Sequence, residues 1–183
     1  MKLILITTII LVSCSRLSFK QYTEYKTANA TNYTIDTLVA HSSYNLVYVP
    51  LEDIIAANET TLERRELKAE YAKMKSVQSS SFQLTIRSTT ALQKQEKILQ
   101  AEYFSIHMKK DIKAVTLSGD TLECRHFLFI PNGSIGNEFV FEMDFQSEIG
   151  NLSHILFSTE FPEKSHFKID LKHFHKNYPS LKI

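Results

Sequence analysis

Residues 138–145 read EFVFEMDF, residues 153–161 read SHILFSTEF and residues 166–171 read HFKIDL. In each segment an apolar side chain returns at nearly every second position, which places one apolar face on an extended strand. The positions on these faces are Phe139, Phe141, Met143, Phe145, Ile155, Phe157, Thr159, Phe161, Phe167, Ile169 and Leu171. The pattern predicts three strands that each cover a hydrophobic core with one face.

Three further apolar runs precede these segments, at residues 103–108, 112–117 and 121–130. The connections between successive runs hold all four glycines of the chain, which are Gly119, Gly133, Gly136 and Gly150. Glycine accepts positive φ at little steric cost, so these connections are typical of hairpin turns. Six strands joined by short turns predict an antiparallel meander or Greek key that packs against a second layer.

The first half of the chain carries fewer strands and most of the helices. Alternation at residues 33–40 and at 82–87 predicts two strands, and the apolar run 44–49 predicts a strand that is buried on both faces. Helices are expected at 50–57, where Pro50 precedes Glu52 and Asp53, at 61–77 after the capping pair Thr60 and Glu63, and at 90–100 after Thr90 and Gln93. Leu67, Tyr71 and Met74 form the core-facing stripe of the second helix, and its basic residues are interspersed with glutamates, as on a solvated face.

These elements favour a mainly β fold, an antiparallel β-sandwich with a helical insertion at about residues 50–100. The alternative is an α+β fold with helices on one face of an antiparallel sheet.

The N-terminal residues carry a targeting pattern. Lys2 supplies a positive charge, and Leu3 to Leu11 is apolar apart from two threonines, which suits a signal peptide and is too short to span a bilayer. The run ends in Leu11-Val12-Ser13-Cys14, which resembles the lipobox of bacterial lipoproteins. The resemblance covers residues 1–14. It implies cleavage before Cys14, lipidation of that thiol with acyl chains such as palmitate, and a membrane anchor.

The expected domain organisation follows from this leader. Residues 1–13 are the signal peptide, residues 14–30 a lipidated cysteine with a flexible polar tether, and residues 31–183 a single globular domain. Ser15 follows the cysteine in place of the aspartate that resembles an inner-membrane retention signal in enteric bacteria, so the outer membrane of a bacterial cell envelope is the expected location.

Composition narrows the function classes. Removing residues 1–13 from the 183-residue chain leaves 170 residues with 20 Lys and Arg against 20 Asp and Glu, because the leader holds one of the 21 basic residues and no acidic one. A net charge of zero argues against nucleic acid as a partner. With Cys14 lipidated, Cys124 has no partner for an intramolecular disulfide, and no motif implies a cofactor.

Two groups of residues in the second half of the chain are candidate sites. Asn132, Gly133, Ser134, Ile135, Gly136 and Asn137 form the loop that we single out as a possible ligand-binding loop, against the alternative of a plain connection. His173 and His175, near His166 and Asp170, are weak metal candidates, and two exposed histidines in a C-terminal extension are the plainer interpretation.

Two strand faces carry further candidates. Glu142 and Asp144 share an outward face that could serve a carboxylate pair or a cation, or could simply be solvated. Cys124 and His126 are predicted to share one strand face with Leu122, Leu128 and Ile130, which favours a buried thiol over a nucleophile pair.

The chain contains no familiar catalytic spacing, so no catalytic residue is predicted and a non-enzymatic role is favoured. The first hypothesis is a membrane-anchored envelope lipoprotein that acts as a binding or assembly module for another envelope protein or a surface ligand. The alternatives are a periplasmic or surface hydrolase whose site is built from distant residues, and an inhibitor or immunity-type lipoprotein.

Overall fold

The computed structural model describes residues 17–88, 94–130, 138–161, 164–176 and 178–183, with no side chains for residues 94–97. The helices are α1 (Phe19–Ala28), α2 (Leu51–Ala57), α3 (Arg64–Val77) and α4 (Lys94–Glu102). The strands are β1 (Thr34–Val39), β2 (Ser42–Val49), β3 (Ser80–Ser88), β4 (Ile112–Thr116), β5 (Thr121–Glu123), β6 (His126–Ile130), β7 (Glu138–Phe145), β8 (Leu152–Thr159) and β9 (Ser165–Asp170). Short helical turns are η1 (Ala30–Tyr33), η2 (Tyr103–His107), η3 (Met108–Asp111), η4 (Ile149–Asn151) and η5 (Lys172–Phe174).

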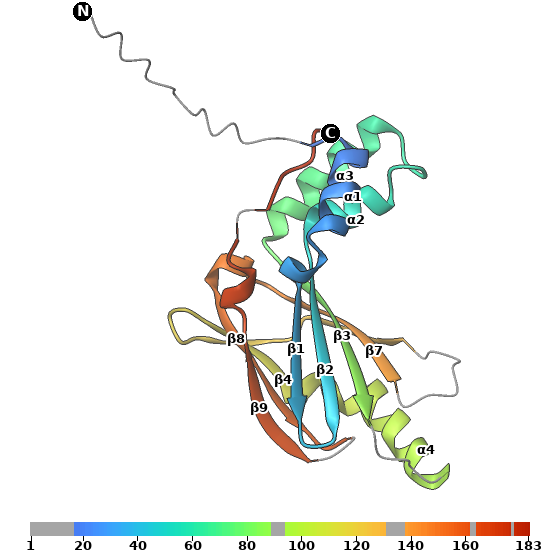
Figure 1. Cartoon of the computed structure of the whole chain (residues 1–183), viewed down its shortest axis with the longest axis vertical. Coiled ribbons are helices and arrows are strands. Elements are labelled where there is room, and N and C mark those ends of the chain that lie inside the picture. The colour runs from blue at the N-terminus through green and yellow to red at the C-terminus, as the bar shows by residue number, and fades with distance from the viewer. Residues whose placement is uncertain (1–16, 89–93, 131–137, 162–163, 177) are drawn as a thin grey trace, which may run out of the picture.

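Two antiparallel sheets pack face to face, as the alternating segments predict (Figure 1). One sheet has the order β1-β2-β3-β7-β6 and the other the order β5-β4-β8-β9. Their inner faces meet through rings such as Tyr44 of β2, which lies 4.6 Å from Phe167 of β9 between ring centroids. The mainly β sandwich is confirmed. β3 lies at the centre of the larger sheet and, along the chain, between helices α3 and α4.

The five-stranded sheet shows how the period of two builds the core. Leu46, Leu84 and Phe141 face one another across β2, β3 and β7, and all three are fully buried. The residues that alternate with these along each strand point outward. The outer face of the sheet therefore carries the polar side chains of the strands. β2 was expected to be buried on both faces, but Val47 and Val49 on its outer face are only half-buried.

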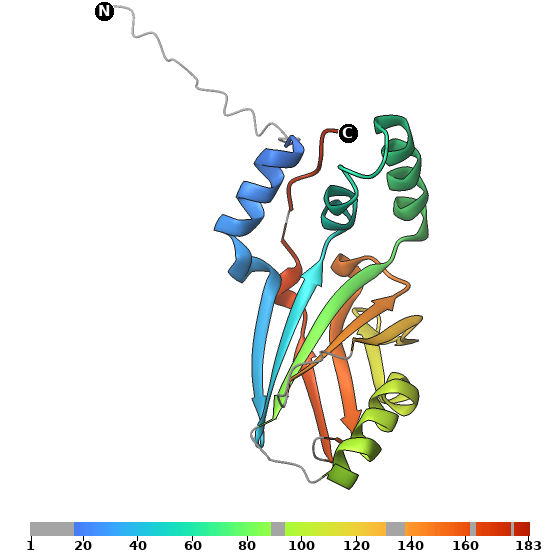
Figure 2. The ribbon, with the colours of Figure 1, turned by 90° about the vertical axis from the view of Figure 1, so that its right-hand side faces the viewer.

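Three helices and the C-terminal residues form a second hydrophobic cluster at one end of the sandwich (Figures 1 and 2). Its buried members are Tyr22 from α1, Ile55 from α2, Leu67 from α3 and Leu181. α3 begins one turn later than expected, because its capping box pairs Glu63 with Glu66 and not Thr60 with Glu63. Within the described residues, no helix is long and apolar enough to span a bilayer.

The prediction of a flexible tether up to residue 30 was wrong for α1. Ser18 and Gln21 close a capping box at its N-terminus, and Tyr22 is 1% exposed. Tyr22 is the one fully buried side chain of the helix, and Phe19 and Tyr25 are partly buried, so the sequence shows no apolar period here. Leu17, the first residue that the structure describes, forms a bridge with Leu181.

The strand predicted at residues 103–108 was also wrong. Residues 103–107 form the π-helix η2, and the N–H of Met108, the first residue of η3, donates to the carbonyl of Tyr103. Tyr103, Phe104 and Met108 are buried, whereas Ile106 is 61% exposed. In a strand Phe104 and Ile106 would share one face, so the burial follows helical and not extended geometry.

The run 121–130 was predicted as one strand and is two. β5 belongs to the four-stranded sheet and β6 to the five-stranded sheet, so the chain changes sheets at Cys124 and Arg125. Beyond this crossing the inward face is shifted by one residue. Phe127 and Phe129 pack on the core, and Leu128, which was expected to face inward, is 46% exposed.

Candidate functional site

A cleft of about 640 Å³ lies between the helices and the outer face of the five-stranded sheet. Its apolar lining includes Val47, Val49, Ile54 and Met74, and its polar lining gathers Lys26, Asp53, Asn58, Ser79, Ser81, Gln83, His126, Glu142 and Asp144. The volume lies in the range of ligand pockets, and the lining combines an apolar surface with a larger number of polar side chains. The cleft is the feature of the described residues best suited to binding.

Its floor is set by strand register. Gln83 of β3 pairs with Glu142 of β7, and Asp144 of β7 pairs with both Ser81 of β3 and His126 of β6. Because residues directly opposite one another on a sheet share a face, these side chains form a polar patch beside the valines of β2. The sequence-predicted pair Glu142 and Asp144 therefore does share one outward face, and that face is the floor of the cleft.

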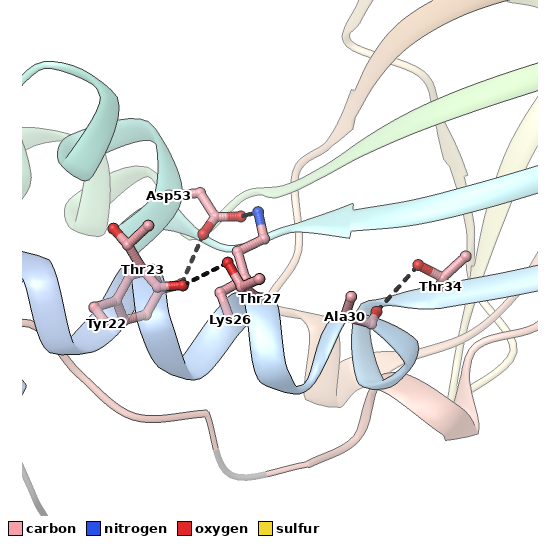
Figure 3. Close-up of polar contacts among 7 residues, drawn as sticks. All are labelled: Tyr22, Thr23, Lys26, Thr27, Ala30, Thr34 and Asp53. Atoms are coloured by element: carbon pink, nitrogen blue, oxygen red, sulfur yellow. Dashed lines mark hydrogen bonds and ion pairs between the residues drawn. The ribbon is translucent and has the colours of Figure 1, made fainter.

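One wall of the cleft is formed where side chains of α1 and α2 contact each other (Figure 3). The Tyr22 hydroxyl donates to Asp53 Oδ1 at 2.8 Å, and the Lys26 ammonium forms an ion pair with Asp53 Oδ2. Burial first, and then the Asp53 carboxylate, raise the pKa of Tyr22 far above its ordinary value, so this hydroxyl remains a donor. Asp53 stands in the first turn of α2 and Lys26 in the last turn of α1, so each charge also suits its helix dipole.

The charges of the cleft are unequal. Lys26 balances Asp53, whereas Glu142 and Asp144 form no ion pair within the part of the chain that the structure describes. The floor thus carries excess negative charge beside an apolar surface. Chemically, such a floor suits a ligand or a protein segment that combines an apolar body with a positively charged group.

The remaining predicted site residues lie elsewhere. His173 Nε2 is 2.9 Å from the carbonyl of Thr31, and His175 Nε2 is 2.7 Å from that of Leu152, so both rings donate to backbone and attach η5 to η1 and β8. Among the described residues, no three His, Cys, Asp or Glu side chains are placed to hold a metal ion. Cys14 and the loop 132–137 lie outside the described residues.

Other candidates do not join the cleft as reactive groups. Cys124 is buried, its thiol lies 2.8 Å from the carbonyl of His126, and burial raises its pKa to about 11, as for a structural thiol. Asp170 accepts from the backbone N–H of Lys172 at 2.7 Å, and His166 Nδ1 lies 3.1 Å from Ser158 Oγ on the four-stranded sheet.

The residues that form the wall of the cleft were not predicted from the sequence. Lys26 lies in a segment that was expected to be a tether, and Asp53 was considered only as a helix-start residue. Their pairing joins positions 27 residues apart through a helix packing that leaves no periodic signal. His126 was considered only beside Cys124, because the change of sheets that turns its side chain toward Asp144 was not anticipated.

These features define a two-sheet β protein with an open, acidic cleft. No protein-family model and no curated protein matches the chain. The solved structures that are similar to it include a novel protein of unknown function from Burkholderia pseudomallei, with 11% identity, a TM-score of 0.41 and coverage of 90% of this chain and 95% of that one. They also include a DUF4426 family protein from Pseudomonas aeruginosa, with 8% identity, a TM-score of 0.36 and coverage of 75% of this chain and 92% of that one. Neither is named for a ligand or an activity, and likenesses of this degree support no functional argument.

Five tyrosines that are buried or partly buried are expected to make the fold less stable at alkaline pH. Burial, the largest cause in each case, raises the pKa of Tyr178 to about 12 and those of Tyr22, Tyr33, Tyr48 and Tyr103 further. The folded state keeps these hydroxyls protonated while the unfolded chain ionises from about pH 10. The contribution of these tyrosines to the free energy of unfolding is therefore fully present below about pH 10. It is lost as the pH rises above that value, by up to ~1.4 kcal/mol per pH unit for each tyrosine.

The measurement is urea unfolding at about pH 8 and about pH 11. Tyr48→Phe removes one ionising group and keeps the ring, so this variant should lose less stability between the two pH values than the wild type. An unfolding free energy that does not change with pH would contradict the raised pKa values.

Proposed function

We propose that this chain is a lipid-anchored lipoprotein of a bacterial envelope whose β-sandwich binds another envelope protein. The observation that carries the proposal is the apolar run that ends in Leu11-Val12-Ser13-Cys14. Only a thiol at the last of these positions can accept a thioether-linked diacylglycerol, and several acyl chains hold a protein on a membrane more firmly than one. The serine after the cysteine supports the outer membrane as the location.

The cleft supports the binding role. Its apolar surface at Val47, Val49 and Met74 offers buried area to a partner, and Glu142 and Asp144 offer acceptors for a basic side chain. Interface energy concentrates where an anchor residue fills a pocket that excludes water. The partner segment that suits this cleft is apolar with a lysine or arginine.

A hydrolase is the second candidate, favoured by one specific observation. The cleft gathers Glu142, Asp144 and His126 on neighbouring strands, and convergent titratable groups in a cleft are the starting point for general acid and base catalysis. A binding role needs these carboxylates as fixed acceptors, whereas a hydrolase needs one of them to exchange protons.

Site-specific cross-linking in intact membranes separates the two candidates. A photo-reactive amino acid at Gln83 lies in the cleft, and the same group at Ser43 lies on the same sheet face near its other end, outside the cleft. The binding role predicts one dominant protein adduct from position 83, lost in Glu142→Gln with Asp144→Asn, and none from position 43. Equal adducts from both positions, or none from either, would contradict it.

A further inference from the structure

The structure holds its first described residue firmly at one end of the molecule. The Leu17 N–H donates to the carbonyl of Ser180 at 2.9 Å, and the Lys182 N–H donates to the carbonyl of Leu17 at 2.8 Å. Three peptide units separate Cys14 from Leu17, so their Cα atoms lie at most about 11 Å apart. Whatever is attached to Cys14 therefore lies close to the place where Leu17 is held.

That place is the tip of the helical cluster, which we call the helical end and define as residues 17–20, 58–64 and 181–183. The start of α1, the connection between α2 and α3, and the C-terminus lie together there (Figures 1 and 2). Phe19, Leu62 and Lys182 line one surface cavity of about 370 Å³ at this tip. The turn between β1 and β2 lies at the opposite end of the molecule (Figure 1).

The surface of the helical end suits contact with phospholipid headgroups. Its apolar side chains Leu17, Phe19, Leu62 and Ile183 are half-buried and reach the surface. Exposed charges around it nearly balance: Lys20, Arg64, Arg65, Lys68 and Lys182 against Glu24, Glu59, Glu63 and Glu66. Because the charge is nearly balanced, electrostatic attraction would contribute little to membrane binding. Acyl chains and apolar contact would hold this surface to the membrane.

We infer that the helical end lies on the lipid bilayer and that the sandwich extends away from it. The inference rests on the proposed lipidation of Cys14 and adds an orientation to it. A short connection to a firmly held Leu17 leaves the domain little freedom to turn over. The acidic cleft, which lies between the helices and the five-stranded sheet, is then nearer to the membrane than the turn between β1 and β2, which points away.

Single tryptophans test the orientation, because the chain contains no tryptophan of its own. Phe19→Trp and Lys182→Trp place a fluorophore at the helical end, and Leu38→Trp places one at the far end, where Leu38 is 75% exposed. Lys182 is exposed, so its variant keeps the test valid if Phe19→Trp folds poorly. Each full-length protein is expressed, purified from membranes and reconstituted into vesicles of phosphatidylethanolamine and phosphatidylglycerol that contain bromine-bearing lipid.

We expect the bromine-bearing lipid to quench tryptophan fluorescence at positions 19 and 182 and to leave the fluorescence at position 38 unchanged. Quenching at position 38 equal to or greater than that at the helical end, or no quenching at any position in protein that floats with the vesicles, overturns the orientation and leaves the anchor standing. Cys14→Ser is the control that should not float with the vesicles. If the proteins that keep Cys14 also do not float, the anchor and the orientation are both contradicted.

Discussion

Replacement of Phe104 by alanine is expected to lower the free energy of unfolding by about 3–5 kcal/mol. Phe104 is fully buried, and its ring lies within 4.8 to 5.7 Å, between centroids, of Phe139, Phe141 and Phe129. Removing the ring takes away these contacts and leaves a cavity that β6 and β7 cannot fill without moving. Urea unfolding of the two proteins at neutral pH measures the difference.

Ile106→Ala is the matched control for this prediction. It lies two residues away in the same π-helix and is 61% exposed, so its truncation is expected to cost less than about 0.5 kcal/mol. If residues 103–108 formed a strand, positions 104 and 106 would share a face and the two variants would behave alike. Equal losses of stability would therefore contradict the helical assignment as well as the predicted magnitude.

The second large effect is expected at Asp53. Asp53→Ala removes the acceptor of the Tyr22 hydroxyl and the partner of Lys26, and it should cost about 2–3 kcal/mol. Most of that cost falls on Tyr22, because its ring is 1% exposed and water cannot replace the lost bond. The Lys26 side chain, at 35% exposure, remains partly hydrated. Thermal or urea unfolding measures the change.

Asp36→Ala provides the comparison. Asp36 also accepts a short hydrogen bond, from Asn45 Nδ2 at 2.7 Å, but it is exposed, so its replacement should cost less than about 0.5 kcal/mol. Tyr22→Phe keeps the packing of the ring and should cost about 1 kcal/mol. A stability of Asp53→Ala as high as that of Asp36→Ala would show that α1 is not held to α2 by this carboxylate.

Strand positions could be predicted from the sequence wherever one face of a strand is buried. The period of two at Phe139 to Phe145 and at Ile155 to Phe161 has a direct physical cause in the pleat, and both strands form. The prediction failed where burial depends on distant partners. α1 keeps one buried ring, η2 buries Tyr103 and Phe104 with a helical step, and the break at Cys124 and Arg125 changes sheets without proline or glycine to mark it.

The candidate site was predictable to the same degree. Glu142 and Asp144 share a face by strand geometry alone, and the structure places that face on the cleft floor. Lys26 and Asp53 could not be assigned to it, because they meet through the packing of α1 on α2. The cleft itself depends on helices that cover one end of a sheet face, and such long-range packing has no signature in a single sequence.

Whether Cys14 carries a lipid is tested most directly by the mass of the mature N-terminus. The full-length chain is expressed in bacteria, the membrane fraction is isolated, and the N-terminal peptide is analysed by mass spectrometry. We predict a peptide that begins at Cys14 and carries the mass of a diacylglyceryl group with its fatty acids. A peptide that retains Met1, or one that begins at or near residue 14 with an unmodified thiol, would contradict the anchored lipoprotein.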